Sequence, residues 1–351
     1  MMIIRPITSE DHEALWSIAN KTGPGFTSLQ PSRSAVKNTL ERALISMDAS
    51  PPEGALYLFV LEDKSISRVV GVCGIESAVG LSTPWYNYKV STHVHVSEEL
   101  GVYNRYDTLS ICNDHTGYSE LCSLFLDPEY RHSRNGQLLS KSRFLFLAGY
   151  PYRFSDEIIA EMRGYSTAEG VSPFWEGLGR NFFSVDFKTA DQQMSKGKAF
   201  IAELMPRNPV YVNLLPEDAQ AAIAKTHENT FAARKILERE GFRYRGYVDI
   251  FDGGPLLEAS VKDIRAVSAS ALHHVKINND SVVESSEDCF ISNEQFSGFR
   301  CGMGSVSFES PSTVYMTKDL ARALHVNDTE VVRVVPCSSV NANTKSKMLN
   351  V

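Results

Sequence analysis

Residues 131–136, RHSRNG, gather several hydrogen-bond donors and one glycine into a single short stretch. The apolar run LCSLFL ends shortly before it, and the helix-like pattern QLLSKSRFLFL follows at once. Unpaired N–H groups at the start of a helix carry partial positive charge, so a turn wound around them can hold an anion. Arg131 and Arg134 would add charge-assisted donors. The stretch therefore indicates a pyrophosphate site, and the alternative is an ordinary solvated loop.

One histidine, His227, is a candidate for proton transfer, and a second, His115, could line an acceptor site or could equally be a turn residue. His227 lies in AKTHENT within a long helical pattern, and His115 lies in the polar NDHTG that precedes the apolar run. An imidazole can give or take a proton near neutral pH, although a lone histidine on a polar face is more often a surface residue. Glu120 is a reserve candidate for a general base. His93 and His95 face one side of a strand, but a metal site needs a third ligand, so no metal is expected.

The composition of the 351 residues limits the classes of function. The formal net charge of −7 argues against nucleic acid and anionic membranes as main partners, since both select basic faces. The first residues do not resemble a signal peptide, and no apolar run approaches the ~20 residues of a membrane span. The six cysteines form no CxxC pair, which is typical of buried, reduced thiols. We therefore expect a cytoplasmic protein that binds small molecules.

Hydrophobic periodicity predicts the elements that must position these groups. Helices are expected at 9–21, 34–47, 136–150 and 172–183, with one continuous helix at 216–241. Strands are expected at 2–7, 56–63, 68–77, within 82–128, and at 157–164, 199–206 and 242–259. The order is strand, two helices, antiparallel strands, then strand–helix–strand–helix–strand. This order predicts an α+β fold around one mixed sheet.

The pattern changes after about residue 265. Short strands at 275–280, 289–293, 304–310 and 329–336 surround a single helix at 317–326. We expect three parts: a main domain at 1–265, a small β-rich C-terminal domain at 266–340, and a disordered tail at 341–351.

In this α+β context the turn resembles motif A of the GCN5-related N-acyltransferase (GNAT) superfamily. That motif, R/Q-x-x-G-x-G/A, grips the pyrophosphate of coenzyme A; Arg131 matches its first position and Gly136 its last. Arg134 stands where the superfamily usually has glycine. Two downstream segments, FWEGLGRNFF and ILEREGFRY, are similar to the superfamily's E-x-x-G-F segment. The resemblance implies a GNAT-like acyltransferase with a central mixed sheet flanked by helices.

Longer segments resemble one family more closely, the bacterial arginine N-succinyltransferases. They are TPWYNYKV (83–90), CNDHTGYSELCSLFLDP (112–128), NGQLLSKSRFLF (135–146), AEMRG (160–164), SPFWEGLG (172–179), KAFIAELMP (198–206) and EGFRYRGYVDIFDGGPLLE (240–258). The similarity runs from the first residues to about 260 and continues more weakly beyond. Because several blocks are long and unusual in composition, chance is a poor explanation.

The resemblance implies transfer of a succinyl group from succinyl-CoA, a co-substrate, to the α-amino group of L-arginine, with no metal and no redox cofactor. His227 matches the family's proton donor. Leu124 matches a position that binds succinyl-CoA; the role would belong to its backbone, because its side chain carries no chemistry. The pyrophosphate would be held by Arg131, Arg134, Asn135 and Gly136.

The acceptor side is less determined. The candidates for the acceptor site are His115, Glu120 and Arg163. Plausible partners for a guanidinium are Asp114, Glu161 and Asp252, and the sequence does not choose among them. Ornithine or another amine is the alternative acceptor, and a non-catalytic acyl-CoA-binding subunit is the alternative class. The resemblance also suggests a homodimer.

Overall fold

The computed structural model describes residues 1–22, 28–48, 54–187, 189–190, 204–278 and 286–338. The strands before residue 265 are β1 Met2–Pro6, β2 Leu56–Asp63, β3 Arg68–Glu76, β4 Asn87–Ser97, β5 Val102–Cys112, β6 Ser119–Leu126, β7 Glu157–Glu161, β8 Val210–Tyr211, β9 Arg243–Val248 and β10 Pro255–Ser260. The strands after it are β11 Ala271–Ile277, β12 Glu287–Asn293, β13 Cys301–Ser310, β14 Thr313–Met316 and β15 Val331–Pro336. The helices are α1 His12–Ala19, α2 Arg33–Ser46, α3 Asn135–Gly149, α4 Arg180–Phe183, α7 Glu217–Ala222, α8 Glu228–Glu240, α9 Arg265–Ser268 and α10 Lys318–Leu324.

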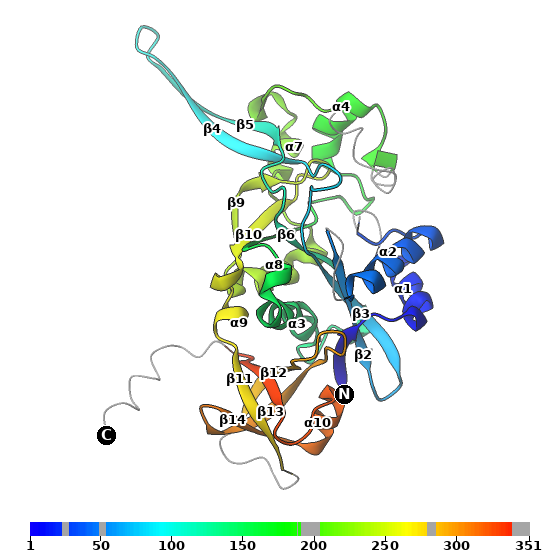
Figure 1. Cartoon of the computed structure of the whole chain (residues 1–351). Helices are drawn as coiled ribbons and strands as arrows, with labels where there is room; N and C mark the ends of the chain where they lie inside the picture. The colour runs from blue at the N-terminus through cyan, green and yellow to red at the C-terminus, as the bar shows by residue number, and fades with distance from the viewer. Residues whose placement is uncertain (23–27, 49–53, 188, 191–203, 279–285, 339–351) are drawn as a thin grey trace, which may run out of the picture.

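These strands form one continuous sheet (Figure 1), in the order β12-β15-β11-β14-β13-β1-β2-β3-β6-β7-β10-β9-β4-β5-β8. Most neighbours are antiparallel, whereas β6–β7 and β11–β14 are parallel. The predicted α+β fold around a mixed sheet is therefore confirmed. None of the helices that the structure describes is long and apolar enough to cross a membrane.

The side chains of β2 show how helices cover both faces of the sheet. Leu56 and Leu58 pack in one core with α1 and α2, whereas Tyr57 and Phe59 pack in another core with α3. Because both faces of this strand are buried, its sequence is a nearly continuous apolar run. We call the two sides of the sheet the α1/α2 face and the α3 face.

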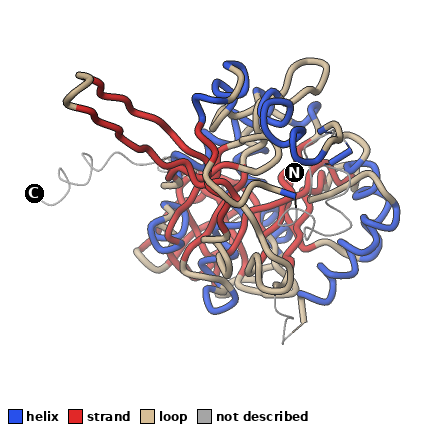
Figure 2. The backbone as a smooth tube through the Cα atoms, turned by 90° about the horizontal axis from the view of Figure 1, so that it is seen from above, coloured by secondary structure: helices blue, strands red, loops and turns tan. Residues whose placement is uncertain are grey.

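β4 and β5 extend beyond the body of the sheet as a two-stranded arm (Figures 1 and 2). They pair with each other from Asn87↔Cys112 to Ser97↔Val102. Strand pairing with the neighbouring strands β9 and β8 is confined to the base of the arm. The strand-rich character predicted for residues 82–128 thus takes the form of a long hairpin followed by β6.

The five C-terminal strands close on themselves, because β12 pairs with both β15 and β13. They enclose a core of their own, in which Val275 and Val332 pack with Leu320 of α10. The register Ile3↔Gly302 and its neighbour join β13 to β1. The C-terminal strands are thus continuous with the main sheet.

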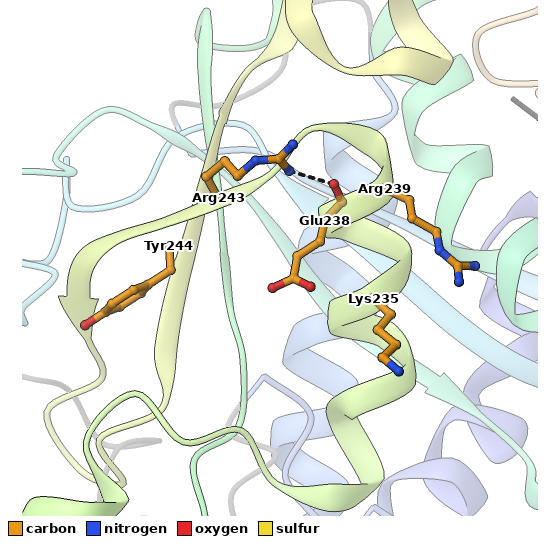
Figure 3. A pocket seen from close by; sticks show the side chains of 5 residues that line it. All are labelled: Lys235, Glu238, Arg239, Arg243 and Tyr244. Atoms are coloured by element: carbon orange, nitrogen blue, oxygen red, sulfur yellow. Dashed lines mark hydrogen bonds between the residues drawn. The ribbon is translucent and has the colours of Figure 1, made fainter. Parts of the chain in front are cut away.

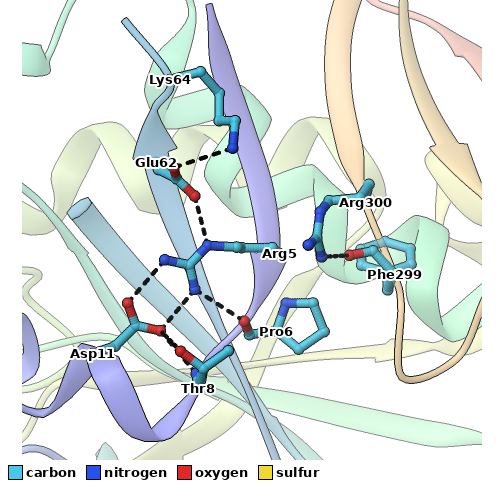
Figure 4. Close-up of polar contacts among 8 residues, drawn as sticks. All are labelled: Arg5, Pro6, Thr8, Asp11, Glu62, Lys64, Phe299 and Arg300. Carbon is cyan, nitrogen blue, oxygen red and sulfur yellow. Dashed lines mark hydrogen bonds and ion pairs between the residues drawn. The ribbon is translucent and has the colours of Figure 1, made fainter. Parts of the chain in front are cut away.

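An ion network reinforces the N-terminal strand near this junction (Figure 4). Arg5 of β1 forms ion pairs with Asp11 at 2.7 Å and with Glu62 of β2 at 2.6 Å. Burial raises the pKa of both carboxyl groups, but the hydrogen bond and charge of Arg5, together with Thr8 at Asp11 and Lys64 at Glu62, hold each pKa below its ordinary value. The network fixes β1 between β2 and the segment that precedes α1.

The prediction of one continuous helix at 216–241 is wrong. Two helices, α7 and α8, replace it, and residues 223–227 between them are not helical. Ala224 has a left-handed φ of 59°, and Thr226 forms a β-bridge with Gly164. Pairing with a distant segment outweighs local helix propensity here. The strand predicted at 199–206 lies largely outside the described residues, and the tail predicted at 341–351 lies wholly outside them.

Candidate active site

Strands β6 and β7 run parallel and separate soon after they begin. Their register pairs Ser119 with Ile158 and Glu120 with Ile159, and it ends there. On its other side β6 stays paired with β3 as far as Leu126. The backbone groups of β6 that face β7 beyond Glu120 are therefore outside that ladder. Such groups can pair with an extended ligand.

A β-bulge lies in the same stretch of β6. The register with β3 shifts between Cys122 and Phe125, and Ser123 has a left-handed φ of 53°. The bulge interrupts the alternation of side chains: Leu121 and Leu124 both pack on the α3 face, whereas Cys122 packs on the α1/α2 face. Bulges re-aim the backbone and are frequent beside active sites. This one changes the direction of the strand at Leu124.

The turn 131–136 follows the C-terminal end of β6 and leads into α3. Two hydrogen bonds from side chains to backbone hold it: Asn135 Nδ2 donates to the carbonyl oxygen of Tyr130 at 3.0 Å, and Arg131 Nε donates to that of Leu126 at 3.1 Å. Asn135 is buried and anchors the turn. Because the first N–H groups of a helix have no partner within it, the start of α3 can receive an anion.

Arg134 has the backbone conformation that glycine favours. Its φ is 63°, the left-handed conformation that explains why the superfamily usually has glycine at this position, and arginine adopts it here at a cost in backbone strain. Its Nη1 lies 3.2 Å from Asp288 Oδ2 on β12, so the side chain reaches toward the C-terminal strands. At Gly136 the nearest atom to an added Cβ is Leu126 Cδ2, at 3.9 Å, so the protein itself leaves room for a side chain there. Arg131 is exposed beside the turn.

His227 caps the N-terminal end of α8. Its Nδ1 accepts a hydrogen bond from the backbone N–H of Asn229 at 3.1 Å. An accepting Nδ1 carries no proton, so the neutral ring has its proton on Nε2. Burial and the nearby guanidinium of Arg163 lower the pKa of His227, which keeps the ring neutral at pH 7. The structure thus places His227 at a helix end and not on a helix face.

The turn and His227 lie at the same edge of the sheet. The C-terminal ends of parallel strands share an edge, and ligands commonly bind outside such ends. The turn follows β6, while Arg163 follows β7 and accepts a backbone hydrogen bond from His227 at 2.9 Å. The predicted pyrophosphate turn therefore lies at the end of β6, and the predicted proton donor is hydrogen-bonded to the backbone just past the end of β7.

His115 is buried just before β6, with 2% of its surface exposed. Its Nδ1 lies 3.2 Å from Asn87 Oδ1, and its Nε2 lies 3.3 Å from Glu258 Oε1. Asn87 Nδ2 donates to Glu161, the last residue of β7, at 3.3 Å. The rings that meet His115 edge-on are those of Trp85, Tyr118 and Tyr247. Hydrogen bonds thus connect His115 to the end of β7.

Glu258 is a residue that the sequence interpretation missed. It is 6% exposed, and its Oε1 accepts no hydrogen bond from the described residues, although His115 Nε2 lies near it. The signal that could have identified it is a carboxylate in the otherwise apolar segment PLLEAS. A buried charge is costly unless something pairs with it, so such a residue merits a functional explanation.

Glu120 lies on the α1/α2 face of β6, next to Cys122. Burial, followed by the carboxylates of Glu120 and Glu76, raises the pKa of the Cys122 thiol. The thiol therefore stays protonated and is a poor nucleophile. All six cysteines are free. In the part of the chain that the structure describes, no three His, Cys, Asp or Glu side chains are grouped as metal ligands would be.

Two aspartates considered for the acceptor's guanidinium have other partners. Asp114 is exposed and accepts a hydrogen bond from the Tyr247 hydroxyl at 2.9 Å. Asp252 is buried and accepts one from the N–H of Gly164 at 2.7 Å. Burial, followed by the Asp249 carboxylate, raises the pKa of Asp252 well above its ordinary value. Asp252 thus holds the backbone that follows β7.

An open groove of about 450 Å³ lies between the C-terminal half of α8 and β9 (Figure 3). Its lining residues are Lys235, Glu238, Arg239, Arg243 and Tyr244. Arg243 Nη1 donates to the carbonyl oxygen of Glu238 at 2.7 Å and so caps the end of the helix. At about 1.5 Å per residue, Arg239 lies roughly 18 Å along α8 from His227. The groove is separate from the predicted site.

Comparisons with known proteins agree with one another. A family model described as the arginine N-succinyltransferase beta subunit matches residues 2–266, and the model of that subunit's C-terminal domain matches residues 273–336. An arginine N-succinyltransferase of Yersinia enterocolitica is 48% identical over 337 residues, which are 95% of this chain and 97% of that protein. One of Citrobacter koseri is 49% identical over 302 residues, covering 86% and 88%.

A solved structure is similar over nearly the whole chain. It is the arginine/ornithine succinyltransferase subunit AI of Pseudomonas aeruginosa, with a TM-score of 0.88 and 32% identity. The alignment covers 97% of this chain and 99% of that one.

Proposed function

Because this chain belongs to the arginine N-succinyltransferase beta subunit family, we propose that it transfers the succinyl group of succinyl-CoA to the α-amino group of L-arginine. Succinyl-CoA is the co-substrate, and the reaction needs no redox change and no further cofactor. The observation that carries the proposed site is the separation of β6 from β7, with the turn 131–136 after one strand and His227 held at the other.

The donor would lie along β6 and the start of α3. Its pyrophosphate would bind at the backbone N–H groups of the first turn of α3. Arg131 would add a charged donor, and Gly136 would let the pyrophosphate come close to the backbone. Its pantetheine arm would pair with the backbone of β6 beyond Glu120. A backbone N–H near Leu124 would polarise the thioester carbonyl, and one such donor can contribute about 3 kcal/mol. This arrangement supports the GNAT-like assignment of the fold.

The proposed reaction is a direct attack. The α-amino nitrogen forms a bond to the thioester carbon, the carbon–sulfur bond breaks, and the amine loses a proton. The coenzyme A thiolate gains a proton, so atoms and charges balance. An acyl-enzyme on Cys122 is disfavoured, because burial and two nearby carboxylates raise the pKa of its thiol.

His227 would act through Nε2. The hydrogen bond at Nδ1 orients the ring and leaves the Nε2 proton to face the reaction. The Nε2–H can donate a hydrogen bond to the leaving sulfur and so stabilise the thiolate; the proton that the thiolate gains is the one that the attacking amine loses, because a neutral imidazole is too weak an acid to give up its own. The lowered pKa of His227 means that the neutral ring performs this role at pH 7.

Ornithine is the second acceptor to consider. One structural relative is described as an arginine/ornithine succinyltransferase, so both amino acids belong in any test. The cytoplasmic location and the homodimer stay predictions.

Release of free thiol from succinyl-CoA tests the proposed function. The purified protein is incubated with succinyl-CoA and with arginine, ornithine, lysine or no amino acid. We expect release with arginine, and the acylated product by mass spectrometry. Absence of release with arginine would overturn the proposal. Thiol release from acetyl-CoA but not from succinyl-CoA would mean that the protein is an acyltransferase with a different acyl donor.

A further inference from the structure

A row of carboxylates crosses the α1/α2 face of the sheet beside the proposed site. Glu76 of β3 is opposite Glu120 of β6, Glu120 is opposite Ile159 of β7, and Ile159 is opposite Glu258 of β10. Residues in such a row share a face. Their neighbours Leu121 and Leu257 pack on the α3 face, which places all of these carboxylates on the other side.

Glu161 belongs to the same group. It lies two residues after Ile159 in β7, so its side chain is on the α1/α2 face as well. Glu76 already binds a guanidinium, since Arg42 Nη2 lies 2.6 Å from its Oε1. The local chemistry therefore suits a planar cation with several N–H donors.

Glu258 contributes an independent observation, a buried acceptor without a donor. Asn87 uses Nδ2 to donate to Glu161, so its Oδ1 must accept from His115 Nδ1. The other ring nitrogen of His115, Nε2, lies 3.3 Å from Glu258 Oε1. That oxygen accepts no hydrogen bond from the described residues. A cationic ligand with N–H groups would supply the donor that this buried oxygen lacks.

We propose that Glu120, Glu161 and Glu258 form the subsite for the positively charged guanidinium of the acyl acceptor. The subsite rests on the proposed function, which places an amine acceptor beside β6. Tyr247 and Trp85, whose rings surround His115, add aromatic surface that favours a cation. The side chain of the acceptor is therefore recognised on the α1/α2 face of the sheet.

The span of the subsite fits the acceptor. Leu124 follows Glu120 by four residues, or roughly 13 Å of strand. The α-amino nitrogen and the guanidinium carbon of arginine are separated by six bonds, about 7 Å when extended. A glutamate side chain covers the remainder. An arginine whose amine reaches the thioester near Leu124 would thus place its guanidinium at the carboxylate row.

Binding of L-arginine and L-citrulline tests this subsite. Citrulline has nearly the same shape, but a neutral urea replaces the guanidinium. Calorimetry on the full chain with saturating coenzyme A gives both affinities without requiring turnover. We expect the wild type to bind arginine at least 30-fold more tightly than citrulline. In Glu258→Gln this ratio should fall below about 5, while the affinity for coenzyme A is unchanged.

Two further variants and a control make the test decisive. Glu120→Gln and Glu161→Gln should each weaken arginine binding about 10-fold or more and leave citrulline binding nearly unchanged. The control is Glu62→Gln, the same change at a comparably buried glutamate of β2 that is paired with Arg5. It should retain the wild-type ratio, even if it lowers the melting temperature.

The outcomes separate this inference from the proposed function. Equal binding of arginine and citrulline by the wild type, or no binding of arginine, overturns the subsite. Wild-type selectivity in all three variants also overturns it. Selective binding that the variants abolish, without thiol release from succinyl-CoA, supports the subsite and overturns the proposed reaction.

Discussion

The backbone N–H of His227 donates a hydrogen bond to the carbonyl oxygen of Arg163, at an N···O distance of 2.9 Å. Arg163 lies two residues past the end of β7, so this bond attaches the start of α8 to the sheet edge where β6 and β7 separate. The ring itself is oriented by the N–H of Asn229. These two contacts, one at the backbone and one at Nδ1, give His227 a defined position in the proposed site.

Replacement of His227 by alanine should lower kcat about 10²- to 10³-fold, the usual contribution of one hydrogen-bond donor to the charge that develops in the transition state. The KM for succinyl-CoA should change less than about twofold, because the donor binds mainly through the turn 131–136. Steady-state kinetics with both substrates would measure this. His274→Ala, on β11, is the control and should behave as wild type. A kcat within about threefold of wild type in His227→Ala would remove this residue from the mechanism.

Acid should impair turnover before it unfolds the protein. Protonation of His227 at Nδ1 would break its hydrogen bond with Asn229 and release the ring. Because burial and Arg163 lower the pKa of His227, this change belongs below the ordinary value of 6.5. We expect kcat to be constant from about pH 7 to 8 and to decline as the pH falls below about 6.5. A profile that is flat down to pH 5 would contradict this role.

Arg131→Ala should raise the KM for succinyl-CoA about 10-fold, the effect of one lost charge-assisted contact to a phosphate. The kcat at saturating donor should stay close to wild type. Increasing salt should weaken donor binding less in the variant than in the wild type, because an exposed charge is screened. The exposed Arg105 of the arm provides the control, Arg105→Ala. An unaltered KM in Arg131→Ala would support the solvated-loop alternative.

The bulge in β6 can be tested at Ser123, which has a left-handed φ of 53°. Ser123→Gly should be nearly neutral, because glycine adopts this conformation without strain. Ser123→Val should destabilise the fold by about 1–3 kcal/mol, since a β-branched residue is strained there. Urea unfolding of both variants would give the two free energies. Equal stability of the two variants would mean that the bulge is not under backbone constraint.

Asp252 should make stability decrease with rising pH. Burial and the Asp249 carboxylate raise the folded-state pKa of Asp252 well above 3.8, so its contribution is fully present below about pH 4 and is lost as the pH rises through the folded pKa. Asp252→Ala should lack this dependence. It should also cost about 2–4 kcal/mol, because it leaves the N–H groups of Gly164 and Gly254 without acceptors.

Unfolding free energies of both proteins from pH 4 to 8 would check this prediction. If the difference between wild type and Asp252→Ala is constant over that range, the carboxyl group is ionised throughout and the expected sign is wrong.

Part of the architecture could be predicted from local patterns. The nearly continuous apolar run of β2 predicts a strand buried on both faces, and Leu56 and Tyr57 do pack on opposite cores. The succession of an apolar strand, a donor-rich turn and a helix at 121–147 predicts the path from β6 to α3, and the structure follows it. The periodicity of a few neighbouring residues determines these elements, and a single sequence contains that information.

Other features depend on contacts between distant segments. The helix predicted at 216–241 is interrupted because Thr226 pairs with Gly164, and helix propensity contains no information about that partner. The same interruption moves His227 from a helix face to a helix end. The separation of β6 from β7 is likewise absent from the sequence pattern, because it is a relation between two strands.

The amino-acid sequence by itself determined the family, the mixed α+β sheet, and the turn and histidine proposed for the donor half of the site, because these follow from residues close together in the chain. Only the tertiary structure decided how carboxylates on different strands are arranged. Glu120 and Glu258 are 138 positions apart. They lie in one row because strand register places both beside Ile159. Register is fixed by burial across the whole sheet, so the acceptor side of the site becomes visible only when the strands are assembled.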